Sequence, residues 1–331
     1  MSMKFVKRIL FLIILAAGFA YFELYSPASN DKQPVFFEIN ASEHLADILP
    51  RLQEKHLIRN QIILKLYARA TDLDTKIKAG RFRIDAELSP AKVLAFLANP
   101  EHGEISVTIP EGFSVFDIDK KLAGLEIMQK GDFIKWAKNF DTAKFPFIKS
   151  VSRGFSVEGY LFPDTYLVFA KNFTPQDLGR AMLQNFEKKI LSQNSGLTDD
   201  LKKNKHSLAE IITMASILEK EVRTKEDYAL ISGILWKRLE SGWPLQADAT
   251  LLYGKADRAL NASDIHDDSD YNTYTRQGLP ITPIGNPGLA MIRAALNPAD
   301  SPYWFYLTTK EGKVMYAKTN EEHNRNKRKS L

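Results

Sequence analysis

The segment that most constrains the fold of this chain is an uncharged apolar run from Ile9 to Phe22, close to the N-terminus. Three basic residues precede the run: Lys4, Lys7 and Arg8. A basic flank followed by an apolar run is typical of an export signal or a membrane anchor. Because positive charge stays on the cytoplasmic side, the residues after about position 25 are expected on the outer side of the cytoplasmic membrane.

Two interpretations of this segment remain open. The apolar run is shorter than the ~20 residues of a spanning helix, but apolar neighbours extend it: Phe5, Val6, Leu24 and Tyr25. We predict that residues 1–25 form an uncleaved, single-pass anchor in the cytoplasmic (inner) membrane, with the rest of the chain on the periplasmic or extracellular side. In the alternative, the small-x-small sequence Gly18-Phe19-Ala20 is a cleavage site and the segment is removed.

Composition excludes several classes of site. The net charge of +5, from 45 basic and 40 acidic residues, is too small and too evenly spread to predict nucleic-acid binding. Cysteine is absent, which excludes disulfides, thiol catalysis and zinc sites built on cysteine. The six histidines have no metal-ligand spacing, so neither a metal nor a cofactor is expected.

The patterns after the apolar segment predict an α+β fold. Residues 26–34 are polar and contain proline, so we expect a short tether. A small α+β subdomain over residues 35–108 is predicted, with strands at 35–39, 80–84 and 104–109 and helices at 42–55, 59–71 and 89–98.

A mixed α/β catalytic domain is predicted over residues 109–331. Its expected helices cover 174–193, 207–223, 224–242, 286–296 and 321–327, where the second begins with the capping box Ser207 and Glu210. A polar loop is expected at 194–205, and short strands at 245–253 and 271–275. The turn Lys310-Glu311-Gly312 predicts a hairpin of strands 303–309 and 313–318.

Two acidic residues, Glu219 and Glu221, lie on the otherwise apolar helix predicted at 207–223. At about 100° per residue, both fall inside the apolar arc, so the helical wheel does not choose between them. Glu221 is expected in the last turn, where the negative end of the helix dipole and apolar neighbours both raise a carboxyl pKa. A raised pKa suits a general acid near neutral pH. Nearby basic residues oppose this shift: Lys220, Arg223 and Lys225.

Polar and aromatic side chains elsewhere suit a cleft that binds carbohydrate, because sugars are bound by aromatic faces and by hydrogen bonds from amides and carboxylates. The candidates downstream are Gln246, Asp248, Asn272, Tyr274 and Asn286, and those upstream are Glu158, Tyr160 and Asp164. We predict that these eight residues and Glu219 bind the substrate.

Together these segments resemble the YceG-like endolytic murein transglycosylases. The matching segments occur in the family's order over nearly the whole exported part: 78–82, 107–112, 158–166, 215–221, 245–248, 271–274, 278–280, 286–288 and 322–324. The resemblance implies a LysM-like subdomain before the catalytic domain, with Glu221 as the essential acid. The chain departs from the family pattern at Ala249 and Thr282, where a Pro and a Gly are usual.

The resemblance also implies a reaction and partners. The substrate would be peptidoglycan glycan strands, cut without water between N-acetylmuramic acid and N-acetylglucosamine to leave 1,6-anhydro ends. Peptidoglycan synthases are the implied protein partners. An older assignment of such sequences as aminodeoxychorismate lyases is disfavoured by the export segment, since that substrate is cytoplasmic.

Two alternatives stay open. The first is a peptidoglycan hydrolase that uses Glu221 together with Asp248, which needs two carboxyl groups about 5–9.5 Å apart. The second is a glycan-binding module without catalytic activity.

Overall fold

The computed structural model describes residues 3–29, 31–40, 43–99, 102–149, 154–171, 173–192, 195–222, 224–255, 260–309 and 312–330. Some residues named above lie outside the described residues: Ser42, Gln193, Asn194, Arg223, Lys310 and Glu311. The chain divides into two compact units. Unit 1 comprises residues 1–107 and 167–173, and unit 2 comprises residues 108–166 and 174–331.

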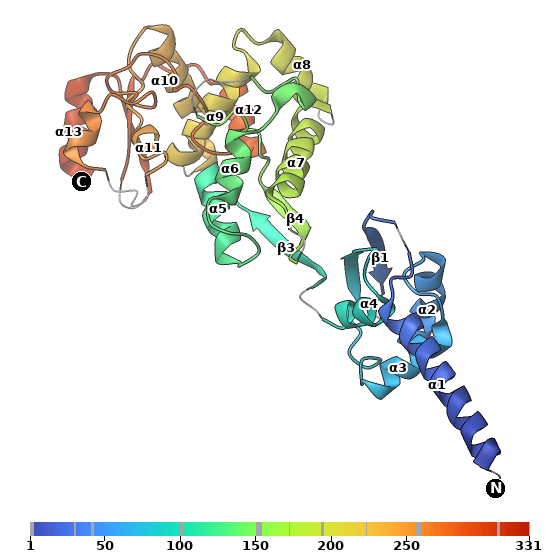
Figure 1. The fold of residues 1–331 in the computed structure, drawn as a ribbon. Helices are drawn as coiled ribbons and strands as arrows, with labels where there is room; N and C mark the ends of the chain where they lie inside the picture. The colour runs from blue at the N-terminus through green and yellow to red at the C-terminus, as the bar shows by residue number, and fades with distance from the viewer. Residues whose placement is uncertain are drawn as a thin grey trace. The chain divides into compact units, whose positions relative to one another are not determined.

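Unit 1 begins with a long helix, α1 (Met3–Tyr25), which projects as a single helix with the N-terminus at its free end (Figure 1). Residues Phe5–Tyr25 have a mean hydropathy of 2.0 and, apart from the buried Glu23, are largely exposed, so this helix is long and apolar enough to cross a membrane. The following segment is held to the unit at its start, because the Arg59 side chain donates hydrogen bonds to the Ser26 and Pro27 carbonyls. The predicted tether is therefore not a free spacer at its N-terminal end.

The body of unit 1 confirms the predicted mixture of strands and helices. Its elements are β1 (Val35–Ile39), α2 (Leu45–Glu54), α3 (Gln61–Ala70), β2 (Gly80–Ile84) and α4 (Pro90–Leu97). β1 and β2 pair antiparallel, with Phe37 opposite Phe82, and both rings are buried in the core. The LysM-like character expected of residues 35–108 stays a prediction.

The chain continues into unit 2 along β3 (Glu104–Ile109), which pairs with β4 (Asp164–Phe169). Between these strands lie α5 (Val115–Gly124) and α6 (Asp132–Lys138). The later elements are α7 (Pro175–Phe186), α8 (Ser195–Lys203), α9 (Leu208–Glu221), α10 (Tyr228–Glu240), α11 (Asp248–Leu251), α12 (Leu289–Leu296), β5 (Phe305–Thr308), β6 (Val314–Ala317) and α13 (Asn320–Ser330). β5 and β6 form the predicted hairpin.

Helix α9 contacts α10, α11 and α12, and the four helices lie close together in unit 2 (Figure 1). Its start is fixed by the predicted capping box, in which the Ser207 hydroxyl accepts a hydrogen bond from the Glu210 amide and the Glu210 carboxylate accepts one from the Ser207 amide. Every side chain from Ile211 to Leu218 is buried. This packing fixes the direction in which the end of α9 points.

Three predictions about unit 2 were wrong. The expected polar loop at 194–205 contains α8, because Leu197 is buried and gives the segment an apolar face that contacts α12. The expected strand at 245–253 contains the short helix α11 instead. The expected strand at 271–275 is a turn, in which the Asn272 side chain bonds to nearby backbone groups in place of a neighbouring strand.

Candidate active site

A cavity of about 1400 Å³ lies within unit 2. Side chains of α5, α11, β5 and α13 line it, together with the last residues of α9. Four residues predicted from the sequence are among the lining residues: Glu221, Gln246, Asp248 and Tyr274. The cavity therefore brings together the end of the apolar helix and two of the predicted polar segments.

Glu221 is the last residue of α9, so it lies in the last turn of this helix, as the sequence predicted. The helix stops there because Val222 adopts an extended backbone (φ −110°, ψ 128°), although its amide still donates to the Leu218 carbonyl. The buried residues from Ile211 to Leu218 hold the helix in place, and the Glu221 side chain lies in the cavity wall.

Burial raises the pKa of the Glu221 carboxyl above its usual value of 4.5, and the negative charge of Asp248 raises it further. Three groups act in the opposite direction: the Ala249 backbone N–H, the Tyr306 hydroxyl and the Arg238 guanidinium. The Tyr306 hydroxyl donates a hydrogen bond to Glu221 Oε2 over 3.4 Å. The net effect is a raised pKa, and a raised pKa suits a carboxyl group that acts as a general acid.

Arg238 and Tyr306 were not predicted as site residues. Arg238, in the last turn of α10, donates from Nε to the Trp304 carbonyl and from Nη1 to the Leu245 carbonyl, both over 2.8 Å. Its guanidinium lies 5.4 Å from the centre of the Phe305 ring. It thus connects α10 to β5 and to the segment before Gln246. A basic residue at a helix end has an ordinary explanation in the helix dipole, so the sequence carried no signal for this role.

Asp248 and Tyr274 face each other in the cavity wall, and the Tyr274 hydroxyl donates a hydrogen bond to the Asp248 carboxylate. Burial is the main cause that raises the pKa of Tyr274, so this hydroxyl keeps its proton. Gln246 is exposed and has a left-handed backbone (φ 54°). The backbone amide of Gln246 donates a hydrogen bond to the Thr273 carbonyl over 3.0 Å. This bond joins the two predicted segments directly.

Glu219 does not line the cavity. Its Oε2 atom accepts a hydrogen bond from the Gly288 amide over 2.9 Å, at the start of α12. Burial raises its pKa, and so does the nearby Glu111 carboxylate. The structure therefore separates the two acidic residues that the helical wheel could not distinguish.

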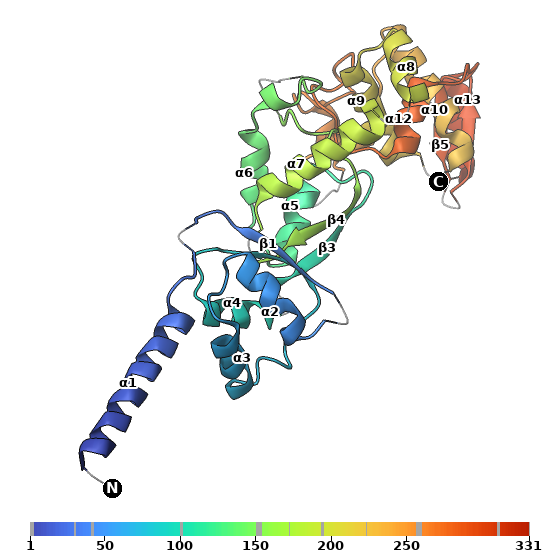
Figure 2. The same cartoon turned by 90° about the vertical axis from the view of Figure 1, so that its right-hand side faces the viewer.

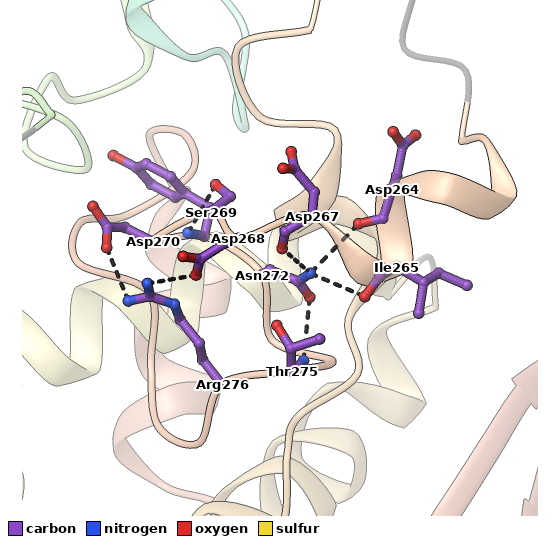
Figure 3. Close-up of polar contacts among 10 residues, drawn as sticks. Asp264, Ile265, Asp267, Asp268, Ser269, Asp270, Asn272, Thr275 and Arg276 are labelled. Atoms are coloured by element: carbon purple, nitrogen blue, oxygen red, sulfur yellow. Dashed lines mark hydrogen bonds and ion pairs between the residues drawn. The ribbon is translucent and has the colours of Figure 1, made fainter.

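Asn272 is buried and does not line the cavity; its side chain bonds to backbone groups of its own loop (Figure 3). Its Nδ2 atom donates to the Ile265 carbonyl over 3.0 Å and to the Asp267 carbonyl over 2.7 Å, and its Oδ1 atom accepts from the Tyr274 amide over 2.9 Å. Beside it, the Arg276 guanidinium pairs with Asp268 and Asp270. These hydrogen bonds stabilise the turn that carries Tyr274. Binding of a sugar by the side-chain amide of Asn272 stays a prediction.

Asn286 and Glu158 are fully buried and bonded to each other, with 3.0 Å between Asn286 Nδ2 and Glu158 Oε1. The Asn286 Oδ1 atom accepts from the Gly159 and Leu161 amides. Glu158 also accepts from the Val115 amide at the start of α5 and from the Tyr253 hydroxyl. Burial is the main cause that raises the pKa of Glu158 to about 7, while its hydrogen bonds act in the other direction.

Tyr160 and Asp164 also do not line the cavity. Tyr160 is buried against the Phe186 ring, with 5.2 Å between the ring centres, and burial raises its pKa to about 12. Asp164 accepts hydrogen bonds from Lys189 and Asn185, and the Lys189 ammonium is the main cause that lowers its pKa to about 2. Contact of these two residues with substrate stays a prediction.

Residues 37–329 match the model of the YceG-like family. The chain belongs to this family. Among its relatives, an endolytic murein transglycosylase of Bacillus subtilis strain 168 is 29% identical over 342 residues, which cover 96% of this chain and 91% of that protein. An endolytic murein transglycosylase of Streptococcus pneumoniae strain D39 is also 29% identical, over 97% of this chain and 64% of that protein.

A crystal structure of a yceG-like protein from Listeria monocytogenes has a TM-score of 0.63 to this chain. It is 28% identical, and the match covers 89% of this chain and 99% of the other. The similarity thus extends over both units of this YceG-like protein.

In this YceG-like chain, many of the motif residues build the frame of the site. The Gly112 amide donates to the Asn286 carbonyl over 2.7 Å, and Gly288 leaves room for the Glu111 carboxylate, which would collide with a Cβ there. Together with the bonds of Glu158 and Glu219, these contacts hold α5, α9 and α12 around the cavity. Among the described residues, no group of three acidic or histidine side chains is placed to hold a metal ion.

Proposed function

We propose that this protein is a lytic murein transglycosylase that cleaves the bond between N-acetylmuramic acid and N-acetylglucosamine within peptidoglycan glycan strands. The observation that carries the proposal is Glu221, a carboxyl whose pKa is raised and which lies in the wall of a cavity of about 1400 Å³. The names of the two bacterial relatives support the substrate.

One carboxyl group is sufficient for the chemistry. Glu221 gives its proton to the glycosidic oxygen, so the bond to C1 of the muramyl residue breaks and the leaving sugar departs with a free hydroxyl. The Glu221 carboxylate then takes the proton of the muramyl 6-hydroxyl, whose oxygen bonds to C1. Glu221 is thereby protonated again, and no water is consumed.

The surrounding residues prepare Glu221 for both steps. Asp248 favours the protonated form before the reaction, while the Tyr306 hydroxyl and Arg238 stabilise the carboxylate that forms. The Asp248 carboxylate also places negative charge near the positive charge that develops at C1.

A second candidate is a hydrolase in which Asp248 activates water. Its support is that Asp248 lines the same cavity and is close enough to raise the pKa of Glu221. The two reactions differ by one water in the product, because an anhydro end lacks the water that a hydrolase adds.

The test is a mass spectrum of the products from purified glycan strands. Anhydro products that vanish in a Glu221→Gln variant support the transglycosylase. Hydrated products support the hydrolase instead. Binding of strands by the unaltered protein without any product supports the glycan-binding module.

We further propose that residues 1–25 anchor the enzyme in the inner membrane as a single span, with residues 109–331 as the catalytic domain on the periplasmic or extracellular side. Residues 35–108 would form a LysM-like subdomain. An anchored enzyme acts on strands as they emerge at the membrane, so it would limit their length beside the peptidoglycan synthases.

A further inference from the structure

Helix α3 of unit 1 presents two large apolar side chains to solvent. Ile62 is 72% exposed and Leu66 is 61% exposed. They are four residues apart, so they lie on the same face of the helix. The opposite face packs into the core through Leu64 and Ala68. A single exposed apolar residue is ordinary on a soluble protein, but an exposed apolar stripe on one helix indicates a binding surface.

Helix α3 also lies next to the end of α1. The Tyr67 ring packs edge-on against the Tyr25 ring, with 6.3 Å between their centres. Arg59, just before α3, lies 4.9 Å from the centre of the Phe22 ring and binds the Ser26 carbonyl. In both overall views, α3 is on the side of unit 1 from which α1 projects (Figures 1 and 2).

The charges of α3 suit a lipid surface. Its sequence, from Gln61 to Ala70, contains Lys65 and Arg69 and no acidic residue. Both basic side chains are exposed. A helix that combines exposed apolar residues with basic ones binds at the boundary between headgroups and acyl chains, where cations attract anionic lipids.

We propose that α3 docks onto the outer surface of the membrane through Ile62 and Leu66, with Lys65 and Arg69 toward anionic headgroups. The proposal rests on the anchoring of α1 proposed above and adds a second point of attachment. A single span leaves the attached unit free to rotate about the helix axis and to tilt. Contact through α3 removes that freedom and keeps unit 1 against the bilayer.

The absence of cysteine gives a direct test, because one introduced cysteine carries a unique fluorescent label. The full chain with Leu66→Cys, labelled with an environment-sensitive dye, is assembled into nanodiscs of phosphatidylcholine and phosphatidylglycerol. We expect blue-shifted emission and loss of intensity when a nitroxide lipid is included. The matched control is Phe36→Cys, whose side chain is 56% exposed. It belongs to β1, the strand that lies at the other end of unit 1 from the free end of α1 (Figures 1 and 2), so its label should stay in water.

A second change tests the apolar face itself. Adding Ile62→Glu to the Leu66→Cys chain should return the label to water, and since Ile62 is exposed the fold does not depend on it. A water-exposed label on a chain that stays in the nanodisc overturns the docking alone, and quenching unaffected by Ile62→Glu does the same. A chain that does not enter nanodiscs at all overturns both the docking and the anchoring.

Discussion

Glu219 and Glu221 are two positions apart on α9, yet their carboxyl groups have different surroundings. Glu219 accepts a hydrogen bond from the Gly288 amide at the start of α12, whereas Glu221 lines the cavity beside Asp248 and Tyr306. Burial raises the pKa of both groups. Of the two, only Glu221 is placed to pass a proton to a ligand in the cavity.

Replacing Glu221 by Gln should therefore abolish cleavage while the fold persists, since the amide keeps the shape but has no acidic proton. Loss of a general acid lowers the rate by about 10²–10⁴-fold. The matched control is Glu219→Gln, for which a milder loss is expected. The measurement is the rate of product formation from purified strands, together with a circular dichroism spectrum of each variant. A larger loss in Glu219→Gln would show that the assignment within this pair is reversed.

The Asp248→Asn variant tests how the site sets the pKa of Glu221. The Asp248 charge raises that pKa, so its removal should lower it. Since Glu221 must be protonated to start the reaction, the alkaline limb of the pH–rate profile should move to lower pH. Asp164→Asn, outside the cavity lining, should leave the profile in place. Complete loss of activity in Asp248→Asn at every pH would favour the hydrolase.

Asn272→Ala should act on stability before it acts on substrate binding. The variant removes the part-buried hydrogen bonds of the Asn272 side chain to the backbone of Ile265, Asp267 and Tyr274, at a net cost of ~0.5–1.5 kcal/mol each. The measurement is the free energy of unfolding in urea. The control is Gln246→Asn. The Gln246 side chain is exposed, and the introduced asparagine tolerates the left-handed backbone at this position. Unchanged stability with weakened strand binding would instead assign Asn272 to the substrate.

At the scale of elements, the site depends on how the turn after Glu158 packs against α9. Gly159 has a left-handed backbone (φ 89°), and a Cβ there would lie 2.7 Å from Ile212 Cγ2 and 2.5 Å from Pro283 Cγ. Its amide donates to Asn286 over 2.9 Å. A side chain at this position would push apart the elements that hold the cavity.

Gly159→Ala should therefore destabilise the protein by about 1–2 kcal/mol from the backbone alone, and by about 1–3 kcal/mol more from overpacking. Gly278→Ala is the matched control, because Gly278 is also left-handed (φ 97°) but has open space around it. The difference in unfolding free energy between the two variants gives the cost of the contact between the added Cβ at position 159 and the side chains of Ile212 and Pro283. Equal values would show that the turn can move away from α9 without cost.

At the scale of the whole molecule, the N-terminal helix decides where the enzyme can act. Phe5–Tyr25 is long and apolar enough to span a membrane, and its end is bonded to unit 1 through Arg59. If the helix is retained, the part of unit 1 that follows α1 begins at the membrane surface.

N-terminal sequencing of the protein recovered from membranes should therefore give the uncut chain, because α1 runs as one helix through Gly18-Phe19-Ala20 and is long and apolar enough to span a membrane. Cell fractionation should find the protein with the membrane. A mature chain that begins at Tyr21 in the soluble exported fraction would contradict the anchor, and with it the argument for action on emerging strands.

The sequence by itself determined most elements and the place of the main acid. Capping residues, apolar periods and turns lie close together along the chain, so Ser207, Gly312 and the apolar run of α9 were sufficient to predict helix starts, the hairpin and a last-turn Glu221. The same local patterns failed where a polar segment gained its structure from distant contacts, as α8 does through Leu197.

Only the tertiary structure decided which polar residues face the cavity and which hold it together. Asn286 and Glu158 look like ligand-binding residues in the sequence, but their polar atoms are bonded to each other across 128 positions. Tyr306 reaches Glu221 across 85 positions, and nothing near it in the chain indicates this. A side-chain amide or carboxylate can bond a sugar or a backbone group equally well, so its role depends on the partner that folding places beside it.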